Sequence, residues 1–254
     1  MSEKSHWTAE CYEALRFYYW EPQWLNRHAN AVKGENRVEQ VIKDLRKAEV
    51  PLNHILNIFF NLAPSALTTR FLSASLPGWT PERMEAQTSP KLDIAPGIDL
   101  CQTDILLEGK ASRVAVELKI GAKTSVDQII KYALFLRFYG DQGSPVPKTP
   151  LLLFISPRED NFLPKGLDLR AMRAALETAN LKPTVVQFAA VSHQSPADVL
   201  DLAASLTVSQ TTYAAFAKFL HDEMGRIDTT EAGETLTNLI GGVLAELSAR
   251  GLTQ

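Results

Sequence analysis

The 254-residue sequence contains little cysteine and no long apolar run. Its two cysteines, Cys11 and Cys101, form no spaced pair with each other or with histidines, which argues against a disulfide framework and a cysteine-based zinc or iron–sulfur site. No apolar run approaches the roughly 18 residues that a membrane span needs, and the N-terminus lacks the apolar segment of a signal peptide. These absences predict a soluble, cytoplasmic protein with no membrane partner.

An excess of charge of either sign is also lacking. The chain has 26 Lys and Arg against 29 Asp and Glu, a formal net charge of −3, so net charge does not mark a nucleic-acid-binding protein. Binding to a nucleic acid would therefore depend on a local basic surface. The sequence has no Gly-rich phosphate loop and no nucleophile elbow, which leaves nucleotide hydrolysis and esterase chemistry without support.

What the sequence does contain is a long series of regular elements with no convincing linker, so we predict one domain over residues 1–254. Helices are expected first, then three strands, a helix, a buried strand, a further helix and strand, and finally three helices from about 196 to 250. This order is typical of an α/β fold. The expected helices are 8–20, 23–33, 35–48, 52–62, 64–75, 125–140 and about 167–180, and the expected strands are 83–88, 101–109, 112–120, 150–156 and 184–191.

The stretch VAVELKIGAK, residues 114–123, places two charged side chains in a strand that is otherwise apolar. Glu117 and Lys119 are two residues apart, so they project from the same face. Asp104 lies on the preceding predicted strand, and pairing of the two strands would bring it to Glu117. Two adjacent buried carboxylates repel each other unless a cation lies between them. A hard divalent ion such as Mg²⁺ (or Mn²⁺) would suit the pair, with Lys119 positioning the attacking water.

Asp104 followed by Glu117-Leu118-Lys119 resembles the PD-(D/E)XK nuclease superfamily. "ELK" matches the (D/E)xK element directly, and "TD" stands in place of the more usual "PD". The resemblance implies a restriction-endonuclease-like core with the order αβββαβ, a mixed central sheet flanked by helices, over about residues 34–192. The remaining N-terminal and C-terminal helices would then be additions to that core.

The resemblance also implies roles for further residues. The Leu118 carbonyl would be an extra oxygen ligand of the metal beside Asp104 and Glu117. An acidic residue is expected on the helix before the sheet, where "ENRVEQVI" offers Glu35 as the first choice and Glu39, one turn later, as the second.

"QIIKY" places Gln128 and Tyr132 at i and i+4 on one helix face. It resembles the QxxxY element of RecB-like exonucleases, which implies that both side chains contact the nucleic acid. From Glu108 to Tyr139, six Lys and Arg stand against three acids, a local excess that phosphate contact requires. Lys123 is the further substrate-binding candidate in this segment.

Simpler explanations exist for each of these residues. Glu117 and Lys119 could be an ion pair on an exposed strand. Gln128 could belong to a capping box that begins at Ser125, and Glu39 could cap a helix that begins at Asn36.

The conjunction of these elements predicts a metal-dependent nuclease that hydrolyses phosphodiester bonds in DNA. The alternative is a non-cleaving nucleic-acid-binding or assembly module on the same fold. A third hypothesis is a structural protein that forms a homo-oligomer or binds a partner protein through its N-terminal or C-terminal helices. The sequence leaves open DNA against RNA and attack at ends against internal attack.

Overall fold

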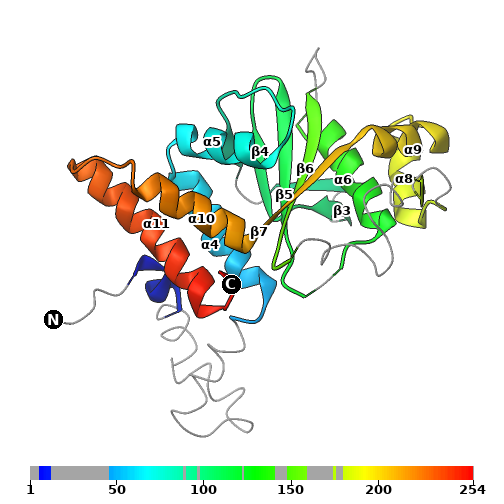
Figure 1. The fold of residues 1–254 in the computed structure, drawn as a ribbon. Coiled ribbons are helices and arrows are strands. Elements are labelled where there is room, and N and C mark those ends of the chain that lie inside the picture. Colours follow the sequence, from blue (N-terminus) through cyan, green and yellow to red (C-terminus); the bar gives the residue numbers. More distant parts are fainter. Residues whose placement is uncertain are drawn as a thin grey trace, which may run out of the picture. The chain divides into compact units, whose positions relative to one another are not determined.

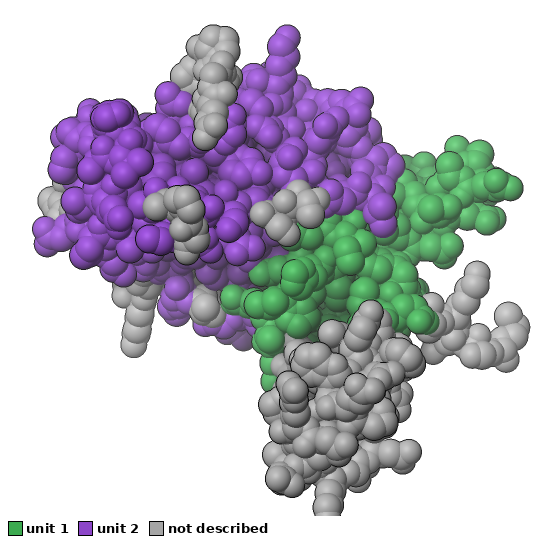
Figure 2. Space-filling model, turned by 180° about the vertical axis from the view of Figure 1, so that it is seen from behind, with its two compact units in different colours: residues 1–59, 213–254 green, residues 60–212 purple. Residues whose placement is uncertain are grey.

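The chain forms two compact units in the computed structural model, and Figure 1 shows their elements. We call residues 60–212 the sheet unit, and residues 1–59 together with 213–254 the helical unit; Figure 2 distinguishes them by colour. The candidate site lies in the sheet unit. The structure describes residues 6–12, 46–87, 90–95, 98–121, 123–140, 148–158, 174–175 and 180–253.

The sheet unit is built on a mixed five-stranded sheet with the order β1-β4-β5-β6-β7. The pairs β1–β4 and β4–β5 are antiparallel, whereas β5–β6 and β6–β7 are parallel. A separate antiparallel pair is formed by β2 and β3. The strands are β1 (Glu85–Gln87), β2 (Lys91–Ala95), β3 (Ile98–Gln102), β4 (Ile105–Glu108), β5 (Ser112–Leu118), β6 (Thr149–Ser156) and β7 (Thr207–Thr212). The predicted α/β fold with a mixed sheet and flanking helices is thereby confirmed.

A tight hairpin joins β4 to β5 and aligns the two strands that carry the candidate acids. Gly109 N–H donates to the Ser112 carbonyl at 2.9 Å. The Glu82 carboxylate accepts from Ala111 N–H at 2.9 Å and from the Ser112 hydroxyl at 2.5 Å. A Cβ at Gly109 would lie 2.5 Å from that carboxylate, so a larger residue would displace the Glu82 side chain. The turn thus fixes the register of β4 against β5.

Helix α6 (Val126–Phe138) connects β5 to the parallel strand β6 and packs against the sheet. It begins at Ser125, whose side chain accepts from the backbone N–H of Gln128. Its buried residues share one apolar core with Leu106 of β4, Ala115 of β5, and Leu152 and Phe154 of β6. Because side chains alternate along a strand, Ala115 and Glu117 project to the same face of β5. The face that α6 covers is therefore the face that carries Glu117.

Several predicted elements are confirmed. Helices α4 (Glu49–Leu62) and α5 (Ser65–Ser75) match the expected helices at 52–62 and 64–75, and α6 matches the expected helix at 125–140. Strands β1, β5 and β6 lie within the expected strands 83–88, 112–120 and about 150–156. The predicted helix 23–33 lies outside the described residues, as do most of the predicted helices 8–20, 35–48 and about 167–180. Across the described ranges, no helix combines the length and apolar character that a bilayer crossing requires.

Three predictions of secondary structure were wrong. Residues 184–191 were expected to be a strand but form helix α8 (Pro183–Val191), which buries Val185, Phe188 and Ala189 at helical spacing. The segment after 196 contains the strand β7 between helices α9 (Pro196–Ser205) and α10 (Tyr213–Met224). The expected strand 101–109 is divided between β3 and β4, with a break at Thr103 and Asp104. The single domain with a helical addition from about 196 stays a prediction; β7 and α9 belong to the sheet unit.

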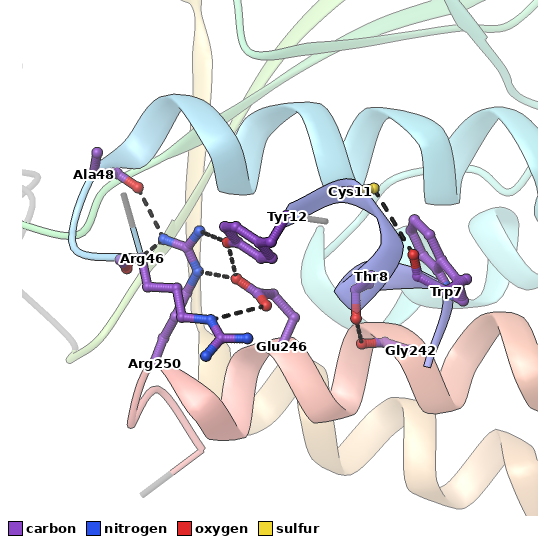
Figure 3. A network of polar contacts seen from close by, with 9 residues as sticks. All are labelled: Trp7, Thr8, Cys11, Tyr12, Arg46, Ala48, Gly242, Glu246 and Arg250. Atoms are coloured by element: carbon purple, nitrogen blue, oxygen red, sulfur yellow. Dashed lines mark hydrogen bonds and ion pairs between the residues drawn. The ribbon is translucent and has the colours of Figure 1, made fainter. Parts of the chain in front are cut away.

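The helical unit contains α10, α11 (Glu231–Ala249) and an N-terminal helical turn at residues 7–12. Figure 3 shows the polar network that attaches this turn to α11. The buried Glu246 carboxylate accepts from the Tyr12 hydroxyl at 2.5 Å and from Arg250 Nε at 2.6 Å. Burial, followed by the hydrogen bond to Glu246, raises the pKa of Tyr12 to about 12. This network, together with the hydrogen bonds of the Trp7 and Thr8 side chains to the Leu239 and Gly242 carbonyls, holds the N-terminal turn on α11.

Candidate metal and catalytic site

The hairpin register brings Asp104 and Glu117 together, as the sequence analysis expected. Ile105 of β4 lies opposite Val116 of β5, so the preceding residue of one strand faces the following residue of the other. Asp104 Oδ2 accepts a hydrogen bond from the Leu118 N–H at 2.8 Å. The break between β3 and β4 therefore places this carboxylate against the end of β5, next to Glu117.

Glu117 is buried and accepts hydrogen bonds from three side chains. Lys119 Nζ lies 2.7 Å from Glu117 Oε1, and both side chains are 7% exposed. Gln128 Nε2 donates to the same oxygen at 3.0 Å. The Tyr132 hydroxyl donates to Glu117 Oε2. The Glu117–Lys119 pair is thus part of a buried network rather than an ion pair on an exposed strand.

The first two turns of α6 supply the donors that face Glu117. Gln128 Oε1 accepts from the Thr124 hydroxyl at 3.0 Å, and Gln128 Nε2 also lies 3.2 Å from the Tyr132 hydroxyl. Ser125 does cap the backbone N–H of Gln128, at 3.1 Å. The glutamine side chain, however, is directed to Glu117, so the capping-box explanation accounts for Ser125 but not for this side chain.

The other end of α6 is attached to β5 by Arg113, a buried residue that the sequence analysis did not single out. Arg113 Nη1 donates to the Leu136 carbonyl at 2.8 Å, and Nη2 donates to Glu108 at 2.9 Å. Four residues of strand from Arg113 to Glu117 span about 13 Å, and eight residues of helix from Gln128 to Leu136 span about 12 Å. The two polar clusters therefore match in spacing and hold the helix along the strand. An arginine inside the apolar run SRVAVEL was the signal that could have identified it.

Burial and mutual repulsion determine the electrostatics of the site. Desolvation, followed by the negative charge of Glu117, raises the pKa of Asp104 to about 8, against the lowering effects of the Leu118 N–H and the Lys119 ammonium. Burial and the same Glu117 charge raise the pKa of the Tyr132 hydroxyl well above its usual value, which keeps it a hydrogen-bond donor. Burial, followed by Glu117, raises the pKa of the Cys101 thiol to about 12. A second ionised group beside Glu117 is therefore unfavourable in the metal-free site.

These residues fit a hard divalent cation. Two adjacent buried carboxylates provide the oxygen donors that Mg²⁺ and Mn²⁺ prefer, and a cation between them would offset the repulsion that raises the pKa of Asp104. Within the described part of the chain, no group of three or more His, Cys, Asp or Glu side chains is arranged so that it could hold a metal ion. Asp104 and Glu117 would therefore need oxygen ligands of another kind or from another segment.

The remaining predicted site residues differ in what the structure says of them. Lys123 is exposed just before α6. Tyr132 is 1% exposed and its hydroxyl donates to Glu117, so in this arrangement the side chain contacts a carboxylate and is closed off from solvent. The Leu118 N–H donates a hydrogen bond to Asp104. The role of the Leu118 carbonyl as a metal ligand stays a prediction. Glu35 and Glu39 lie outside the described residues.

Comparisons with family models, with curated proteins and with solved structures each give no match to this chain. A functional assignment therefore depends on the residues of the site. Two carboxylates, a lysine and neutral donors, buried together at the end of two strands, suit metal-assisted hydrolysis of a phosphate ester better than any chemistry that needs a nucleophilic serine or cysteine.

Proposed function

We propose that this protein is a metal-dependent nuclease that hydrolyses phosphodiester bonds in DNA. The observation that carries the proposal is the convergence of Asp104 and Glu117, with Lys119 in contact with Glu117. These are the three residues that resemble the PD-(D/E)XK motif. Glu117 and Lys119 share a face of one strand, and the hairpin register adds Asp104 from the neighbouring strand to the same buried cluster.

The order of elements around the cluster supports the same proposal. Asp104 immediately precedes β4, and Glu117 lies near the end of β5. Helix α6 follows with Gln128 and Tyr132, and β6 then pairs in parallel with β5. This order agrees with the later part of a restriction-endonuclease-like core. We propose that the sheet unit contains such a core.

In the proposed mechanism, Asp104 and Glu117 would hold Mg²⁺ or Mn²⁺ together with the Leu118 carbonyl and an acid such as Glu35 or Glu39. The ion would supply Lewis-acid activation of the phosphate and a bound water of lowered pKa. The Lys119 ammonium orients the attacking water and offsets charge that develops on the phosphate.

Three other residues have supporting roles in the proposal. Gln128 and Tyr132 hold the Glu117 carboxylate in one orientation through the hydrogen bonds described above. Lys123, which is exposed between β5 and α6, would contact a phosphate of the DNA backbone.

The test is cleavage of labelled linear and circular DNA by the full chain, with Mg²⁺, Mn²⁺ or EDTA. Wild type should cleave with a metal and fail in EDTA, and Lys119→Ala should lose cleavage while its circular dichroism stays native. Asp127→Asn is the matched control, because Asp127 lies in the first turn of α6, close to the site in sequence, and its carboxylate pairs with Lys131 and Lys182. Full activity of Lys119→Ala would refute the proposed site.

The same assay separates the alternative. Salt-sensitive DNA binding without cleavage under any metal would support a non-cleaving binding module. Loss of linear but not circular DNA would assign the enzyme to attack at ends. Cleavage of RNA in preference to DNA would change the substrate class and leave the site assignment intact.

A further inference from the structure

The candidate site already contains a cation of its own. Lys119 Nζ lies 2.7 Å from Glu117 Oε1, and the two side chains are almost fully enclosed. The contact is local, because residues i and i+2 of a strand project together, and the Lys119 N–H is held by the Ile155 carbonyl of β6 at 2.9 Å. The ammonium therefore neutralises Glu117 without a metal.

We propose that Lys119 is an internal counter-ion that competes with the divalent cation for Glu117, so that metal binding and release of the lysine are one exchange. The inference rests on the proposed function for the identity of the site. It adds that the lysine is paired with Glu117 before the metal binds and is freed toward the substrate only afterwards.

The hydrogen-bond pattern of Glu117 explains why the two cations exclude each other. Oε1 already accepts from Lys119 and Gln128, and Oε2 accepts from Tyr132, so donors occupy at least three of the roughly four lone-pair positions of the carboxylate. A divalent ion bound at Oε1 would lie within a few ångströms of the ammonium, where like charges in a buried site repel strongly. One of the two must leave.

Lys119 is the donor that is able to leave. Its ammonium is at the end of a flexible four-carbon chain, whereas Gln128 and Tyr132 are neutral and are held by α6. Gln128 is further held by the Thr124 hydroxyl at 3.0 Å. The exchange would therefore move the lysine and leave the orientation of the Glu117 carboxylate unchanged.

Mn²⁺ affinity measured by electron paramagnetic resonance of the free ion tests this exchange in the full chain. Lys119→Met removes the competitor and should bind Mn²⁺ about 10-fold to 100-fold more tightly than wild type, which corresponds to one buried hydrogen bond to a charged group. Lys119→Arg keeps the charge and should bind no more tightly than wild type. Lys218→Met is the matched control, since Lys218 forms a 2.8 Å pair with Asp222 on the surface. Equal or weaker binding by Lys119→Met would overturn the proposal.

A measurement on wild type covers the case in which Lys119→Met does not fold. Lysine acetylation followed by peptide mass spectrometry should label Lys119 slowly without metal, because its side chain is buried and paired, and several-fold faster with saturating Mn²⁺. Lys218 should be labelled equally in both conditions. Unchanged or slower labelling of Lys119 with Mn²⁺ would mean that the lysine stays on Glu117, and the exchange would be refuted.

The two proposals can fail separately. If Lys119→Met binds Mn²⁺ more tightly but wild type cleaves no nucleic acid, the exchange stands and the nuclease assignment fails. If wild type cleaves DNA and Lys119→Met binds Mn²⁺ like wild type, the nuclease stands and the exchange fails.

Discussion

Replacement of Asp104 by asparagine should make the metal-free protein more stable at neutral pH. Burial and the adjacent Glu117 charge raise the pKa of Asp104 to about 8, so ionisation of this carboxyl destabilises the fold. Asparagine has nearly the same shape, keeps an oxygen for the Leu118 N–H, and places an amide donor where a carboxyl proton would otherwise be needed. The variant therefore removes the charge and keeps the contacts.

The sign and size of the effect follow from linkage. With a raised pKa, the folded chain keeps a proton that the unfolded chain releases above the ordinary aspartate pKa of about 4. The stability that this proton provides is complete below about pH 4 and is lost as the pH rises toward about 8. Each pH unit in that window corresponds to about 1.4 kcal/mol. Between about pH 5 and pH 7, the advantage of Asp104→Asn over wild type should therefore grow by about 3 kcal/mol.

Urea denaturation in EDTA, followed by tryptophan fluorescence, measures this difference; Trp79 lies in the same unit as the site, with its Nε1 on Ser112. Asp198→Asn is the control. Hydrogen bonds from Ser195 lower the pKa of Asp198, so its contribution is lost only as the pH falls below the ordinary aspartate range, and the difference between about pH 5 and pH 7 should stay constant. A constant difference for Asp104→Asn as well would refute the reasoning from burial and proximity.

Three further substitutions test the packing around the site and the attachment of the N-terminal turn. Tyr132→Phe removes a donor to Glu117 and should lower the free energy of unfolding by about 1–2 kcal/mol in the same denaturation assay; an unchanged value would contradict the contact. Arg113→Met removes the buried guanidinium that holds the end of α6 and should cost about 3–5 kcal/mol, whereas a cost below about 1 kcal/mol would mean that the helix is held by apolar packing. Gly242→Ala would place a Cβ 2.0 Å from Trp7 Nε1, so limited proteolysis should cut the N-terminal turn faster than in wild type; equal rates would argue that the indole simply moves aside.

The contacts that the sequence could predict are those of short range. Glu117 and Lys119 are related by strand alternation, and Gln128 and Tyr132 by one helical turn, so their common faces follow from geometry alone. Asp104 required one further step, the pairing of two strands through a short turn, and the register confirms it. The convergence of these two sets on the same carboxylate depended on the angle at which α6 packs, which no local pattern specifies.

Two errors in the secondary-structure prediction concern β7 and α8. Strand β7 is polar, partly exposed along its whole length, and pairs in parallel with β6, from which it is separated by some fifty residues of chain. Its sequence TVSQTT shows no alternation because neither face is fully buried. Helix α8 was mistaken for a strand because its β-branched and aromatic residues favour strands, although Pro183 at its first turn and the spacing of its buried residues indicated a helix.

A purely structural ion pair accounts for part of the cluster and leaves Asp104 unexplained. One ammonium is enough to neutralise Glu117, and Gln128 and Tyr132 satisfy its remaining oxygens. Asp104 adds a second buried carboxyl whose pKa is raised to about 8, which makes the fold less stable at neutral pH than an uncharged residue of the same shape would. Residues that act against their own fold are expected where chemistry requires them. The destabilising acid, rather than the well-satisfied one, is therefore the stronger reason to expect a cation at this site.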